Sequence, residues 1–194
     1  SGVILSDPVG FIKLLLQGMI LTFPDQVRGW MAAYGKYGGA LAITQTESGA
    51  TDLIENPLGE QALEGLAVLG NFGYIGTSLS ANGLPKKRGE SASFGVIDLT
   101  TRQAIFRHEF EGVESVRQFV LESKTGVVGG IAGGKLFLYD TNARTFLKEH
   151  PMEPTRVTSY TMAAPGDGHI YFGQDKALLR CNVSSGIVTK IATL

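Results

Sequence analysis

Short hydrophobic runs separated by small and polar residues recur along this chain. In the stretch 126–151 they are rich in Val, Ile, Leu, Phe and Tyr and have the length of strands. Glycines 133 and 134 separate the first two runs, and Asp140 with Asn142 separates the last two; these residue types reverse a chain within a few positions. The stretch predicts an antiparallel meander of three strands: Gly126–Ile131, Lys135–Asp140 and Arg144–Glu149.

The same meander occurs four times. One strand of each copy closes with an acidic or amide residue, at Gln45, Asp98, Asp140 and Asn182, so that the spacing is 53 and then twice 42 residues. The preceding strand begins in each copy at a glycine: Gly18, Gly73, Gly126 and Gly168. Another apolar run lies upstream of each, and in the first copy this run is Phe11–Leu14. Each unit thus has four strands, named a to d below. A period of about 42 residues with four strands per unit is typical of β-propeller blades.

The predicted fold class is therefore all-β, a β-propeller with about four four-stranded antiparallel blades, either complete or part of a larger ring. A β-sandwich and a β-solenoid are the alternatives. Residues 1–8 are expected to be a leader or a strand of a preceding blade. The expected blades span residues 9–58, 59–114, 115–155 and 156–194. Blades 1 and 2 are longer because insertions separate strands b and c, at Pro24–Gly38 and Leu79–Ser91.

Three segments carry a family resemblance: GYIGTS at 73–78, FGVIDLTTRQ at 94–103 and KLFLYDTNAR at 135–144. With them the sequence resembles the broad group of WD40-, YVTN- and quinoprotein-like propellers. The Asp that closes strand c stands where that of a Trp-Asp dipeptide would. No blade has a Trp-Asp pair, and no quinone-site or lactonase metal pattern is present. The resemblance implies the fold and leaves the function open.

A propeller must close its ring, since its end blades otherwise expose free edges. Three arrangements are compatible with the repeats. Further blades outside this chain complete a larger ring, a second chain completes it as an oligomer, or the four blades close alone. The first two are favoured.

Composition excludes several function classes. The net charge of −1 favours neither a nucleic-acid partner nor a membrane surface. The longest apolar run, Phe11–Phe23, is interrupted by polar residues and too short to span a bilayer, and no basic leader marks a signal peptide. The single Cys181 excludes a disulfide within the chain and a Cys-rich metal site. No motif indicates a cofactor, and no segment indicates a compartment.

Both insertions are expected on one face of the propeller, where b–c loops gather. Aromatic rings beside cations suit a carbohydrate, an acidic polymer or a protein partner. The alternative is that the rings pack onto their own blade and the basic run is only solvated. The candidate ligand-binding residues are Arg28, Trp30, Tyr34, Lys36 and Tyr37 in the first insertion, Lys86, Lys87 and Arg88 in the second, and His150 beside a loop on this face.

Two other functions remain open. A propeller-type polysaccharide lyase, hydrolase or lactonase would use carboxylates near the channel mouth, and the acids of the d–a loops are Glu60, Glu64, Glu111, Glu114 and Glu153. A structural assembly module would join chains through the end blades, at Val9–Leu16 or Gly186–Leu194. His108, His150 and His169 fall on separate strands, so no shared metal is expected. Asp98, Asp140 and Asn182 are expected to form turns by bonding their own backbone.

Overall fold

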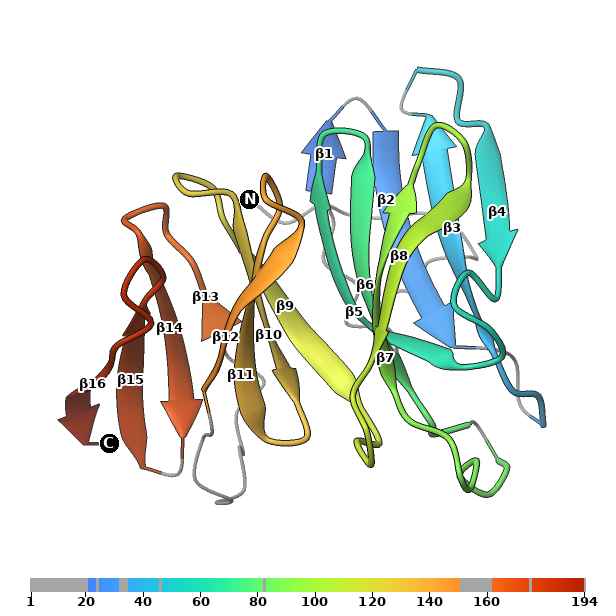
Figure 1. The fold of residues 1–194 in the computed structure, drawn as a ribbon. Coiled ribbons are helices and arrows are strands. Elements are labelled where there is room, and N and C mark those ends of the chain that lie inside the picture. The colour runs from blue at the N-terminus through green and yellow to red at the C-terminus, as the bar shows by residue number, and fades with distance from the viewer. Residues whose placement is uncertain are drawn as a thin grey trace.

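The computed structural model describes residues 21–23, 25–31, 35–45, 47–81, 83–150, 162–174 and 176–193. They form four antiparallel four-stranded sheets, each ordered as in the chain, and contain no helix (Figure 1). Sheet 1 holds β1 (Leu21–Phe23), β2 (Asp25–Met31), β3 (Gly39–Gln45) and β4 (Thr51–Glu55). Sheet 2 holds β5 (Ala62–Leu69), β6 (Phe72–Ser78), β7 (Ser93–Asp98) and β8 (Gln103–Glu109). Sheet 3 holds β9 (Val116–Glu122), β10 (Val127–Ala132), β11 (Lys135–Asp140) and β12 (Thr145–His150). Sheet 4 holds β13 (Met162–Ala163), β14 (His169–Gln174), β15 (Ala177–Asn182) and β16 (Val188–Thr193).

The strand assignment in sheet 1 corrects the sequence prediction. The second strand was expected to begin at Gly18, and Pro24–Gly38 was expected to be an insertion. In the structure, β1 ends at Phe23 and the second strand is β2, which pairs with β3 over its whole length. The loop between β2 and β3 therefore begins only after Met31. The upstream run Phe11–Leu14, expected as the first strand, lies outside the described residues.

In sheets 2 to 4 the acid or amide that closes the third strand shapes the following turn, as predicted. Asp98 Oδ1 accepts bonds from the amides of Thr100 and Thr101, and Asp140 Oδ1 accepts bonds from those of Asn142 and Ala143. Asn182 Oδ1 accepts a bond from Ser185 N at 2.9 Å. The turn ends on a left-handed residue, four positions after the closing residue, in every sheet: Gly49, Arg102, Arg144 and Gly186.

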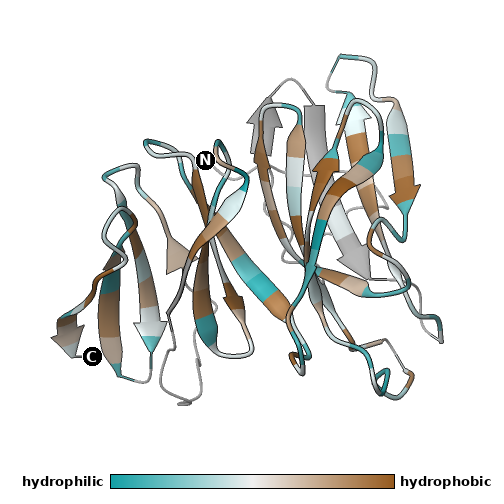
Figure 2. Ribbon diagram, viewed as in Figure 1, coloured by the Kyte–Doolittle hydropathy of each residue, from teal (hydrophilic) through white to brown (hydrophobic). Residues whose placement is uncertain are grey.

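Alternation along the third strands divides the core between neighbouring sheets. Side chains two and four residues before the closing residue face the following sheet, as Phe94 and Val96 do from sheet 2. Those one and three residues before it face the preceding sheet, as Phe137 and Tyr139 do from sheet 3. Three clusters result, one at each boundary between consecutive sheets. In Figure 2 the hydrophobic colour concentrates within the strands, whereas many turns are hydrophilic.

Aromatic rings fill the boundary between sheets 2 and 3. Phe94 and Tyr139 are almost fully buried, and their ring centroids lie 4.8 Å apart. Burying a side chain of this size contributes roughly 2–3 kcal/mol each. This cluster is the largest of the three and includes these rings: Tyr74, Phe94, Phe106, Phe110, Phe119, Phe137, Tyr139 and Phe146.

The four sheets stand in a row. Strand β9 lies against β5 of sheet 2 and against β13 and β14 of sheet 4, and β5 also lies against β2. Sheets 1 and 4 are at opposite ends of the row, and their described strands share no extended contact (Figure 1). The described residues therefore form an open row rather than a closed four-sheet ring.

Candidate functional site

The loop before β3 and the loop before β7 touch each other, although they belong to different sheets. The Tyr37 hydroxyl donates a hydrogen bond to the carbonyl oxygen of Pro85 at 2.8 Å. The ammonium of Lys87 lies 5.2 Å from the centroid of the Tyr37 ring. A cation over an aromatic face contributes roughly 0.5–1 kcal/mol at such a position. The two loops are thus joined, and we call this region the joined loops (35–38 and 83–91).

The lysines of the joined loops are paired with acids of the protein itself. Lys86 forms an ion pair with Glu114. The Lys87 ammonium nitrogen lies 3.5 Å from Glu60 Oε2 and 3.4 Å from Glu90 Oε1. The side chain of Lys87 is only 17% exposed. These acids come from the d–a loops and from the second insertion. The basic run is therefore largely neutralised, which reduces its attraction for a polyanion.

Other predicted ligand-binding residues lie in different settings. Lys36 and Arg88 are exposed on the joined loops. Arg28 and Trp30 are on strand β2 rather than in a loop, where their backbones pair with Ala42 and Ala40. His150 ends β12, and its backbone pairs with Leu136. Tyr34 lies outside the described residues.

A buried polar network that the sequence did not reveal anchors the second loop to sheet 2. Thr77 Oγ1 donates to Gln61 Oε1 at 2.5 Å and accepts a bond from Ser93 N at 2.7 Å. Gln61 Nε2 donates to Ser91 O at 3.0 Å and to Glu90 at 3.2 Å. The side chains of Gln61, Thr77 and Ser93 are nearly or fully buried. Since each polar group has a partner, the network holds the base of the loop in place. Single Gln, Thr and Ser residues carry no motif that could have indicated it.

Three of the five acids proposed for an enzyme are engaged in local contacts. Glu60 and Glu114 pair with the two lysines, and Glu64 accepts a bond from Ser115 Oγ at 2.9 Å. The ring of His108 packs against Phe110 and Phe146. The described part of the chain holds no group of three or more His, Cys, Asp or Glu residues placed to bind a metal. Glu153 lies outside the described residues.

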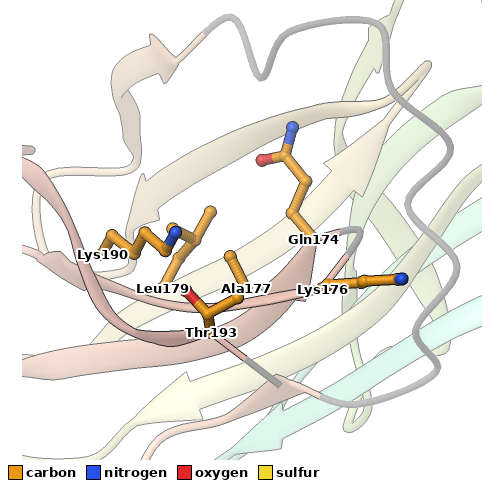
Figure 3. A pocket seen from close by; sticks show the side chains of 6 residues that line it. All are labelled: Gln174, Lys176, Ala177, Leu179, Lys190 and Thr193. Carbon is orange, nitrogen blue, oxygen red and sulfur yellow. The ribbon is translucent and has the colours of Figure 1, made fainter.

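A hollow of about 270 Å³ lies at one end of sheet 4 (Figure 3). Its apolar floor includes Ala177 and Leu179, and Lys176 and Lys190 stand at its margin. In Figure 3 the ammonium group of Lys176 extends away from the other labelled side chains and lies far from that of Lys190. They do not converge on one position, so the hollow lacks the arrangement expected of an anion site.

No protein-family model matches the chain, and no curated protein matches it either. Within the described residues, no helix has the length and apolar character needed to cross a membrane. The candidate site must therefore be interpreted from its own chemistry.

Proposed function

We propose that this chain is part of a β-propeller and acts as a recognition scaffold. Four consecutive four-stranded antiparallel sheets packed face to face support the propeller, together with the repeat of about 42 residues. In such a scaffold the loops carry the variable surface, and the sheets hold it rigid.

The binding surface in this proposal is the joined loops, and the partner is a protein. The observation that carries this assignment is the contact of Tyr37 with Pro85 and Lys87, which fixes two loops from different sheets into one surface. Because Lys86 and Lys87 alternate with Glu60, Glu90 and Glu114, the surface presents both signs of charge. A protein partner can match such a pattern group by group, whereas a uniform polyanion would meet the acids as well.

Site-specific photo-crosslinking tests this proposal. A benzophenone amino acid replaces Arg88 on the joined loops or, as the control, Lys124, an exposed residue in the turn after β9. Irradiation in an extract of the source cells is expected to give a discrete protein adduct from position 88 alone. The double substitution Lys36→Glu and Arg88→Glu should reduce co-purification of that protein at least tenfold, and Lys124→Glu should leave it unchanged.

Two results would overturn the assignment. Equal crosslinking from positions 88 and 124 would mean that the joined loops are not the binding surface. Salt-dependent retention of the wild type on heparin, lost in the double variant, would replace the protein partner with an acidic polymer.

A further inference from the structure

Strand β4, the outermost strand of sheet 1, keeps a regular pairing along its whole length (Figure 1). The register of Thr51–Glu55 with β3 shows no shift. The outermost strands of the other sheets, β8, β12 and β16, each contain a β-bulge, and the residue without a partner is in turn Ile105, Leu147 and Ile191. A bulge disturbs the row of backbone groups that a further strand would need. Among the described residues, β4 is thus the outermost strand that lacks this protection.

The side chain at the centre of β4 also differs from its counterparts. Leu53 pairs with the residue that stands three positions before the closing residue of β3. At the same position of the other sheets, the pairing places three charged residues: Arg107, Glu149 and Lys190. Charged side chains on an edge strand oppose the addition of a further strand. Strand β4 has an apolar side chain there instead, and it is 55% exposed.

The counterpart on β8 shows that a preceding sheet leaves this position accessible. Arg107 pairs with Gly95, and a Cβ at Gly95 would lie 2.5 Å from Leu58, which belongs to the cluster between sheets 1 and 2. Since paired residues project from the same face, the Arg107 side chain lies on the side of sheet 1. It is nevertheless 41% exposed. A blade that precedes sheet 1 would therefore leave Leu53 accessible as well.

The backbone groups of β4 that face away from β3 belong to alternate residues. Asn56 N donates to Gly39 O at 2.8 Å, which marks a closely spaced pair in this register. Counting in twos from there, Ile54 and Asp52 also exchange their bonds with β3. The N–H and C=O groups that point outward are those of the intervening residues: Thr51, Leu53 and Glu55. No described strand pairs with this side of β4, and these groups are arranged as a further antiparallel strand requires.

Side-chain contacts hold this edge in place. Asn56 Oδ1 accepts a bond from Gly39 N at 3.2 Å at the end of β4. Asp52 Oδ2 accepts a bond from Arg102 Nη2 of sheet 2 at 2.7 Å, and the two side chains form an ion pair. Because β4 is already ordered, binding has to order the added segment alone, and this lowers the entropic cost of binding.

We propose that the edge of β4 accepts an extended segment of a partner protein as a further antiparallel strand of sheet 1. In this mode the main-chain hydrogen bonds supply affinity, and alternate side chains supply selectivity. The segment carries an apolar residue opposite Leu53 and a basic residue opposite Glu55, which is exposed and forms no ion pair with another described residue. A second copy of β4 would instead add its own acids, Asp52 and Glu55, to an acidic edge, so a basic segment suits this edge better.

Titration of the ¹⁵N-labelled chain with a synthetic peptide tests the edge. The peptide Ser-Lys-Thr-Val-Thr-Thr-Ser, capped at both ends, places its valine opposite Leu53 and its lysine opposite Glu55 when it runs antiparallel to β4. Saturable shifts of the β4 amide resonances are expected and yield a dissociation constant. Hydrogen exchange at the outward amides, those of Thr51, Leu53 and Glu55, should slow on binding. The amides of Asp52 and Ile54 should change less, since they already bond to β3.

Matched variants separate the edge from other exposed apolar positions. Leu53→Lys copies the lysine of β16 and should weaken peptide binding about tenfold, because it removes the apolar pair with the valine. Ile105→Lys makes the same change at an exposed residue of β8 and should leave the dissociation constant unchanged. A peptide that is N-methylated at its valine keeps the side chain and loses the N–H that bonds to Leu53 O, so it should also bind about tenfold more weakly.

Several results would overturn the proposal. These are the absence of saturable shifts in β4, binding that N-methylation leaves unaltered, and equal weakening by Leu53→Lys and Ile105→Lys. Slow exchange of the same outward amides without peptide, which rises with protein concentration and which Leu53→Lys abolishes, would show that a second copy of the chain occupies the edge instead. The two variants leave the joined loops unchanged, so this experiment and the crosslinking at position 88 fail independently.

Discussion

At the scale of single residues, Glu122 ties sheets 3 and 4 together. Its side chain is fully buried at the end of β9. One carboxylate oxygen accepts a bond from Gly168 N at 3.1 Å across the sheet boundary, and the other accepts bonds from Thr125 N and Thr125 Oγ1 at 2.8 and 2.6 Å. Burial raises the pKa of Glu122, but the hydrogen bonds outweigh it, and the net pKa is lowered. The ionised carboxylate therefore stabilises the folded state.

Glu122→Gln is expected to lower the free energy of unfolding by about 1–3 kcal/mol at pH 7, because an amide group replaces one of the two acceptor oxygens. The folded pKa lies below the value of about 4.3 for an unfolded chain. The contribution of the charge is therefore complete above that value and lost as the pH falls through the folded pKa. Urea unfolding at pH 7 and at pH 3 measures the difference, which should shrink at the lower pH. Glu111→Gln, at an exposed residue, is the control and should change stability by less than about 0.5 kcal/mol. A constant difference at both pH values would contradict this role of the charge.

At the scale of elements, glycines set how closely strands from neighbouring sheets approach. A Cβ at Gly76 on β6 would lie 2.2 Å from the carbonyl oxygen of Val116 on β9, closer than any real contact. A Cβ at Gly73 on the same strand would come closest to the end of the flexible Leu99 side chain, at 3.2 Å. Both glycines have extended backbones, which alanine adopts as well. Their substitution by alanine therefore tests whether the added methyl group fits, not whether the backbone conformation is allowed.

Gly76→Ala is expected to destabilise the protein by about 1–3 kcal/mol, because β9 must move away from β6 and loosen the aromatic cluster. Gly73→Ala should lower the free energy of unfolding clearly less than Gly76→Ala does, since Leu99 can change its rotamer. Chemical denaturation of the two variants compares them directly. Equal losses would mean that the approach of β9 to β6 does not depend on Gly76.

Some of these elements could be located from the sequence, and others could not. Strands β7, β11 and β15 were located because each is a compact apolar block that ends in an acid or amide, and the turns after them follow from the same residues. Strand β2 was missed because Asp25, Gln26 and Arg28 give it a polar character, and Pro24 suggested a loop. One signal was present: Val27 stands two residues before Gly29, as Tyr74 stands before Gly76.

The joined loops were predicted to share a face, whereas their contacts with Glu60 and Glu114 depend on pairing between distant residues that no local pattern encodes.

At the scale of the whole molecule, the row of sheets depends on apolar faces that match one another. Sheets 1 to 3 each present apolar side chains to the next sheet. On the face of sheet 4 turned away from sheet 3, which we call its outer face, Arg180 and Tyr171 stand instead. A polar face offers a second molecule less apolar area to bury than an apolar face does. Arg180 is therefore expected to limit self-association of the chain.

Arg180→Leu restores the apolar character that Ile43, Val96 and Leu138 have at the same position of the other sheets. The variant is expected to associate in a concentration-dependent manner, since its outer face then offers apolar area that a second molecule can bury. Light scattering after size exclusion measures the mass of the variant and the wild type over a range of concentrations. Arg88→Leu, the same change on the joined loops, should leave the mass at the wild-type value. If Arg180→Leu also keeps that value, the guanidinium does not limit association.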